Sequence, residues 1–67
     1  MSAKVLTKTE RAVAECVARS LNSYQISQHL DMSWHTVRTH RTNIRAKGFR
    51  DTAAITRYAV QQGWVVV

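Results

Sequence analysis

Residues 21–48 constrain the fold more than any other part of this sequence. They read as a short helix, a tight turn at residues 31–33 and a longer helix over residues 34–47. Asn22 and Ser33 are of the residue types that cap helix N-termini, and each precedes one of these helices. The segment is therefore predicted to form two consecutive helices, with Met32 of the turn pointing back into the core.

The longer predicted helix has two different sides. At about 100° per residue, Val37 and Ile44 share one side, with His40 and Arg41 beside them. The opposite side carries His35, Arg38, Thr39, Thr42 and Ala46. Residues 34–50 hold several basic and no acidic side chains: Arg38, Arg41, Arg45, Lys47 and Arg50. An apolar side fixed to a core and an outer side of cations and hydroxyls suit a helix lying in a DNA major groove. A solvated basic helix is the alternative interpretation.

Size and composition favour one small all-α domain spanning residues 1–67. The chain has 67 residues, no proline and two glycines, so long irregular loops are not expected. Ten Lys and Arg residues against four Asp and Glu residues give a formal net charge of +6. This charge favours a polyanionic partner, although many small basic proteins bind nothing acidic.

A helix over about residues 7–19 is predicted to precede this segment. It begins with a capping box, in which the side chains of Thr7 and Glu10 can accept hydrogen bonds from each other's backbone amides. Apolar residues at helical spacing in this helix and the following segment form the predicted core: Val13, Val17, Leu21, Ile26, Leu30, Met32, Val37 and Ile44.

A last helix is predicted over about residues 53–62. Asp51 or Thr52 can cap its N-terminus, and Gly63 ends it. It is followed by an apolar tail at residues 64–67, which would either cover the core or extend an interface.

Several functional classes find no support in the sequence. Cys16 is the only cysteine, so it is expected to be a small apolar residue in the first helix. It cannot form a zinc site with the three histidines at these spacings. No grouping of acidic residues, or of Ser, His and Asp, indicates an enzyme. No apolar run is long enough for a membrane span or a signal peptide. We therefore expect no metal, no cofactor and no membrane partner, and a cytoplasmic, nucleoid-associated location.

The third predicted helix carries a specific family resemblance. Its matching positions are Ser33, Thr36, Val37, Arg38, His40, Asn43 and Ile44. Together with Leu6, Thr7, Glu10 and Val13 at the start of the chain, they resemble the LuxR/FixJ/GerE type of helix-turn-helix domain. Four departures are visible: Gln25 replaces a usual Glu, Ser20 replaces a frequent Gly, residues 45–48 are one residue shorter, and Thr52 replaces a common Arg.

The resemblance implies a four-helix DNA-binding domain of a bacterial or phage transcription regulator. Its third helix would read bases, and its fourth would form a homodimer on an inverted repeat of double-stranded DNA. Family positions, and the outer side of the third helix, indicate Arg38, Thr39 and Thr42 as base readers. His35, on the same side, would either read a base beside them or simply be solvated. The predicted phosphate contacts are Ser33, Thr36, Tyr24, Lys8, Arg41, Arg45 and Lys47. The predicted dimerisation residues are Ala54, Ile55, Tyr58, Ala59 and Val60.

Some alternatives stay open at this point. The chain is expected to be largely monomeric when free and to pair on DNA, with RNA polymerase or a larger regulator as further partners. A rival hypothesis is a small interaction module that pairs with a larger LuxR-type regulator through the fourth helix and the tail. Trp34 would either pack on a sugar–phosphate edge or cover Met32 and the turn. The chain is either a stand-alone family member or a domain of a longer protein.

Overall fold

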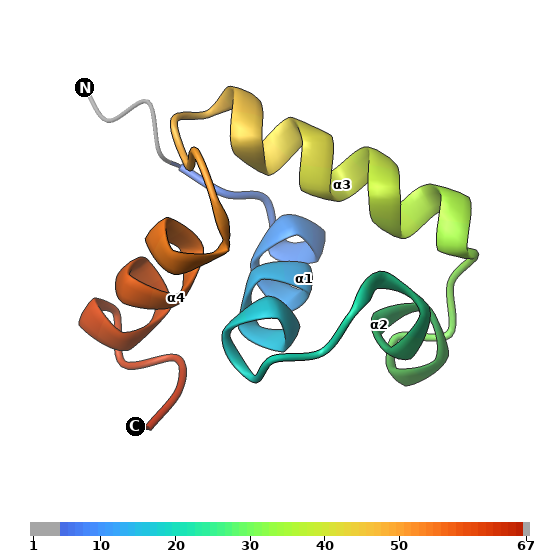
Figure 1. Cartoon of the computed structure of the whole chain (residues 1–67), viewed down its shortest axis with the longest axis horizontal. Helices are drawn as coiled ribbons and strands as arrows, with labels where there is room; N and C mark the ends of the chain where they lie inside the picture. The colour runs from blue at the N-terminus through green and yellow to red at the C-terminus, as the bar shows by residue number, and fades with distance from the viewer. Residues whose placement is uncertain (1–4, 67) are drawn as a thin grey trace.

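The computed structural model describes residues 5–66, which form four helices. These are α1 (Lys8–Ala18), α2 (Ser23–His29), α3 (Trp34–Ala46) and α4 (Thr52–Gln61). Figure 1 shows α3 running across one side of the molecule over α1 and α2, while α4 lies on the side of α1 away from α2. The described residues contain helices and turns only, so the predicted all-α fold is confirmed.

Each helix begins with a side-chain cap at a predicted position. In α1, the Thr7 hydroxyl accepts from the Glu10 amide at 3.1 Å and Glu10 accepts from the Thr7 amide at 2.9 Å. Asn22 and Gln25 make the same reciprocal pair at the start of α2. The caps of α3 and α4 are Ser33 and Asp51. These contacts fix all four helix starts within a residue of their predicted places.

Each helix is followed by a residue in the left-handed backbone region. These residues are Ser20 (φ 68°), Asp31 (φ 53°), Gly48 (φ 108°) and Gly63 (φ 75°). After α1, the Ser20 amide donates to the Val17 carbonyl and the Leu21 amide to the Cys16 carbonyl, which is the Schellman pattern. Ser20 therefore stands where the backbone favours glycine, which explains why the family often has Gly at this position.

The core lies around α1, which packs against each of the other three helices. Its buried residues are Val13, Ala14, Cys16, Val17, Ile26, Val37, Ile44, Phe49 and Ile55. Leu21, Leu30 and Met32 pack against it while partly buried, as predicted. The sequence analysis omitted Phe49 from the core. Only 2% of its surface is exposed, and it is the largest of the fully buried side chains among the described residues. Its ring meets that of Tyr58 edge-on, with centroids 5.0 Å apart, and so joins the α3–α4 connection to α4.

An ion pair joins the end of α3 to the start of the chain. The Lys47 ammonium bonds to the carboxylate of Glu10 and also donates to the Val5 carbonyl at 2.9 Å. The Glu10 side chain is nearly buried, and the Lys47 side chain is less than one-third exposed. The hydrogen bond from Lys47, aided by that from the Thr7 amide, holds the pKa of the Glu10 carboxyl below its usual value. This contact fixes the orientation of α3 relative to α1.

The C-terminal segment packs partly against the core, which is one of its two predicted roles. The Trp64 ring lies edge-on to Tyr58, with centroids 5.5 Å apart, and Arg11 stacks over it at 4.7 Å. The Trp64 amide donates to the Ala59 carbonyl and so closes α4. Val67 lies outside the described residues.

Candidate nucleic-acid interface

The two sides of α3 have the opposed character that the sequence predicts. Val37 and Ile44 are fully buried against the core, so they fix the rotation of the helix about its axis. His35, Arg38, Thr39 and Thr42 are all exposed. A helix held by one side and exposing polar side chains on the other is the arrangement that major-groove recognition requires.

One shallow hollow on the outer side of α3 brings the four predicted base readers together. It is lined by His35, Arg38, Thr39 and Thr42, which occupy successive turns of the helix. The Thr39 hydroxyl donates to the His35 carbonyl at 3.2 Å, and the Thr42 hydroxyl donates to the Arg38 carbonyl at 3.1 Å. Because these hydroxyl hydrogens are used within the helix, the threonines offer outward lone pairs and methyl groups. Arg38 is then the strong hydrogen-bond donor of the hollow.

Trp34 contacts Arg38 one helical turn away. The guanidinium carbon of Arg38 lies 4.8 Å from the centroid of the indole ring. Trp34 is 49% exposed, so it does not serve mainly as a core residue. The sequence analysis missed this contact, although the spacing of four residues between an aromatic and a cationic side chain could have indicated it.

A second hollow lies between α3 and the start of α2. It is lined by Asn22, Ser23, Arg38, Arg41, Thr42 and Arg45. The Arg41 guanidinium donates to the Ser23 hydroxyl at 3.1 Å, which ties α3 to α2 and orients this arginine. Sequence analysis did not assign Asn22 or Ser23 to the interface. Arginines lining one hollow, with no acidic side chain among its lining residues, provide a positive surface beside the base-reading positions.

The other predicted phosphate contacts occupy different parts of the surface. Ser33 caps α3, and its hydroxyl is hydrogen bonded to that of Thr36 at 2.8 Å. Tyr24 is exposed on α2, and its hydroxyl accepts from Gln28 at 2.9 Å, so the phenol keeps its own hydrogen for donation. Lys8 is exposed at the start of α1.

Lys47 has a role in the fold that the sequence analysis did not foresee. Its ammonium is held by Glu10 and the Val5 carbonyl, so a phosphate would have to compete with both. The predicted phosphate role of Lys47 stays a prediction, whereas its role in joining α3 to α1 is visible in the structure.

His40 departs from expectation in one respect. The residue lies partly buried, as its place beside Val37 and Ile44 predicts. A partly buried imidazole at this place is expected to find a backbone hydrogen-bond partner. Within the described residues, however, the buried Nδ1 atom has no hydrogen-bond partner.

The residues predicted for dimerisation fall into three groups by burial. Ile55 and Ala59 are buried in the core of the single chain, so their side chains do not offer surface to a partner. Ala54 and Tyr58 are partly buried and pack against that core. Val60 is exposed. The side of α4 that carries Ile55 and Ala59 therefore closes the fold of the single chain, and the dimer role of the five residues stays a prediction.

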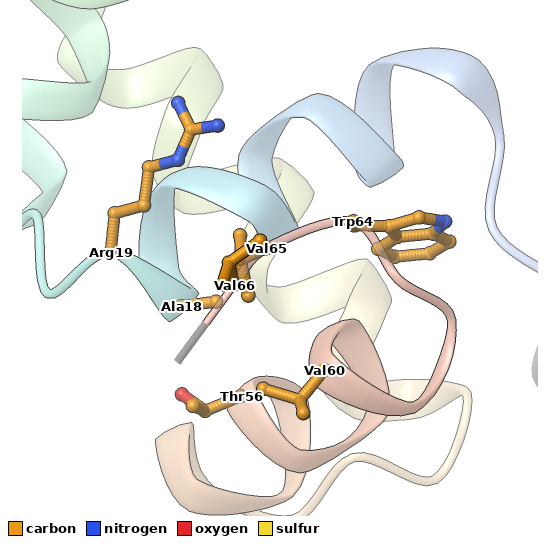
Figure 2. A pocket seen from close by; sticks show the side chains of 7 residues that line it. All are labelled: Ala18, Arg19, Thr56, Val60, Trp64, Val65 and Val66. Carbon is orange, nitrogen blue, oxygen red and sulfur yellow. The ribbon is translucent and has the colours of Figure 1, made fainter.

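An apolar groove adjoins Val60. Figure 2 shows Val65 and Val66 of the C-terminal segment beside Ala18 at the end of α1, with the side chains of Thr56 and Val60 on α4 across the groove. Trp64 and Arg19 complete its lining. Val66 is almost fully exposed.

The sequence matches the family described as "Bacterial regulatory proteins, luxR family" over residues 4–59. Because this match covers most of the chain, the protein belongs to the LuxR family and carries its GerE-type helix-turn-helix domain. The domains of this family are DNA-binding regulators of transcription rather than enzymes. No curated protein and no solved structure matches the chain. The groove beside Val60 lies mostly outside the matched residues.

Other kinds of site are not visible in residues 5–66. That part of the chain holds no cluster of three or more His, Cys, Asp or Glu side chains able to bind a metal ion. None of its helices has the length and apolar character needed to cross a membrane. Burial raises the pKa of the Cys16 thiol, which therefore stays protonated as an apolar core group.

Proposed function

We propose that this LuxR-family chain regulates transcription by binding, as a dimer, an inverted-repeat operator that each subunit reads through α3. The observation that carries the proposal is the shared hollow of His35, Arg38, Thr39 and Thr42 on a helix whose opposite side is fully buried. An α-helix fits the major groove of B-DNA, and base edges there differ for every base pair. The proposed site of action is the nucleoid in the cytoplasm.

Arg38 is the proposed reader of guanine. Its planar guanidinium can donate two parallel hydrogen bonds to O6 and N7 of one guanine, the commonest specific contact in the major groove. Thr39 and Thr42 are proposed to place their methyl groups on thymine methyls, since their hydroxyl hydrogens are used within α3. His35 lies at the edge of the same hollow and would contact the flanking base pair.

Phosphate contacts are proposed to flank these base contacts. Arg41 and Arg45 line the hollow at the α2–α3 junction and would hold one DNA strand. Ser33 and Thr36 stand at the start of α3, where the helix dipole favours an anion. Tyr24 on α2 and Lys8 on α1 would contact the DNA backbone further from the base-reading positions. Lys47 would contribute mainly through its long-range charge, since Glu10 holds its ammonium.

The dimer is proposed to form through the exposed part of α4. Val60 and the neighbouring apolar groove supply free apolar surface, whereas Ala54 and Tyr58 are partly buried against the core of the single chain. A surface on one short helix falls below the size of a stable interface, so pairing would occur mainly on DNA. Two recognition helices one turn of DNA apart would give half-sites about 10 bp apart.

The rival function is a small module that pairs with a larger LuxR-type regulator or with RNA polymerase. The observation that favours it is the apolar groove at the C-terminal segment, where Val66 is exposed. Selection of bound oligonucleotides from random-sequence DNA distinguishes the two functions. An enriched inverted repeat with half-sites about 10 bp apart supports the regulator. Recovery of unenriched DNA, or of none, contradicts it and favours the module.

A further inference from the structure

Trp34 is the first residue of α3 and is exposed more than a core residue would be. Trp34 is 49% exposed, and it contacts Arg38, one of the residues that line the hollow of the proposed base readers. The rest of the core is complete without it, because Met32 of the preceding turn packs against the buried cluster and Trp34 is not part of that cluster. The indole ring is therefore free to contact a neighbouring side chain on the surface of α3.

The geometry of α3 brings Arg38 to the indole ring. Residues four apart on a helix lie on the same side, and side chains lean toward the N-terminus of the helix. Arg38 therefore leans back over Trp34, and its guanidinium carbon lies 4.8 Å from the indole centroid. An arginine stacked on an aromatic face keeps its N–H donors in the plane of the guanidinium, where they remain available for hydrogen bonds.

We propose that Trp34 is a positioning residue, which holds the guanidinium of Arg38 in place for reading a base. This inference rests on the proposed function of Arg38. A long arginine side chain samples many rotamers when free, and ordering it on binding weakens affinity. Stacking on Trp34 orders the side chain before DNA arrives. From the strength of exposed cation–π contacts, the gain is about two- to fivefold in affinity for each half-site.

A first test uses the free protein and needs no DNA. Ring currents from the indole should move the Arg38 Hδ and Hε proton resonances upfield in the wild-type NMR spectrum. The shift should disappear in Trp34→Leu and persist in Trp34→Phe. Arg11→Gln is the matched control and should leave the Arg38 resonances unchanged. It removes a similar arginine–tryptophan contact, that of Arg11 with Trp64 at 4.7 Å, on another part of the surface. Ordinary arginine shifts in the wild-type protein would overturn the inference.

A second test is a double-mutant cycle with DNA. Affinities of the wild type, Trp34→Leu, Arg38→Ala and the double variant are compared on the selected operator and on a scrambled duplex. Trp34→Leu should weaken operator binding about two- to fivefold per half-site, with a smaller effect on scrambled DNA. Trp34→Phe should restore most of this loss. In the Arg38→Ala background, Trp34→Leu should have no further effect.

The outcomes separate this inference from the proposed function. If Trp34→Leu weakens binding equally with and without Arg38, Trp34 acts on DNA or on the fold directly and the positioning role is overturned. If Arg38→Ala abolishes discrimination while Trp34→Leu changes nothing, only the positioning role falls. If the wild-type protein does not distinguish the two duplexes, the proposed function falls and this inference falls with it.

Discussion

Replacing Lys47 with methionine should destabilise the fold rather than weaken DNA binding directly. The substitution keeps the unbranched apolar stem and removes the ammonium that bonds to Glu10 and to the Val5 carbonyl. Glu10 then keeps its nearly buried carboxylate with only the Thr7 amide as a partner. Leaving a mostly buried polar group with fewer partners costs about 1–3 kcal/mol. For a domain of this size, that lowers the melting temperature by about 4–8 °C per kcal/mol.

The pH dependence of this loss provides the sharper test. The folded-state pKa of Glu10 is depressed, so the stability contributed by its contacts is fully present above the unfolded carboxyl pKa of about 4.3. That stability is lost as pH falls through the lower folded-state pKa. The difference in melting temperature between wild type and Lys47→Met should therefore be large at pH 7 and should shrink toward pH 3.

Thermal unfolding followed by circular dichroism at both pH values measures this difference. Arg45→Met is the matched control, because Arg45 lies two residues before Lys47, in the last turn of α3, and is exposed. The control should leave the melting temperature nearly unchanged. If Lys47→Met and Arg45→Met have the same melting temperature at pH 7, the ion pair does not hold α3 to α1 as described.

Three further predictions concern the helix ends and the DNA contacts. Ser20→Gly should raise stability by about 1 kcal/mol in thermal unfolding, because Ser20 has a φ of 68°, whereas Gln61→Gly at the end of α4 should not. Val60→Glu should leave the chain folded but abolish cooperative binding to the full operator in gel-shift titration. Gln61→Glu should bind normally, and cooperative binding by Val60→Glu would exclude the α4 dimer. The logarithm of affinity should fall with the logarithm of salt concentration with a slope beyond about −4, and Arg45→Ala should reduce that slope by about 0.9 per subunit. An unchanged slope would remove Arg45 from the phosphate contacts.

Local chemistry explains why the helices could be predicted so closely from the sequence. A cap such as Thr7 with Glu10, or Ser33 with Thr36, is a contact between residues three apart, and short spacing leaves few alternatives. The outer side of α3 was equally predictable, because helical periodicity alone separates Arg38 from Val37.

Contacts between distant residues could not be predicted in this way. The ion pair between Glu10 and Lys47 joins residues 37 positions apart, and no local pattern specifies it. Phe49 lies in a connection between helices, outside any periodic pattern, yet only 2% of its surface is exposed. Ile55 and Ala59 are apolar residues that would suit either a core or a contact with a partner helix. Only the packing of α4 on α1 places them in the core.

The most direct test of base reading through α3 is the ratio of affinities for the selected operator and a scrambled duplex at one salt concentration. Arg38→Ala should lower this ratio by the equivalent of about 1–3 kcal/mol for each half-site, because one guanine loses its paired hydrogen bonds. Binding to the scrambled duplex should change much less. Equal losses of affinity on both duplexes would show that Arg38 contacts phosphate, and would contradict the assignment of α3 as the reader of sequence.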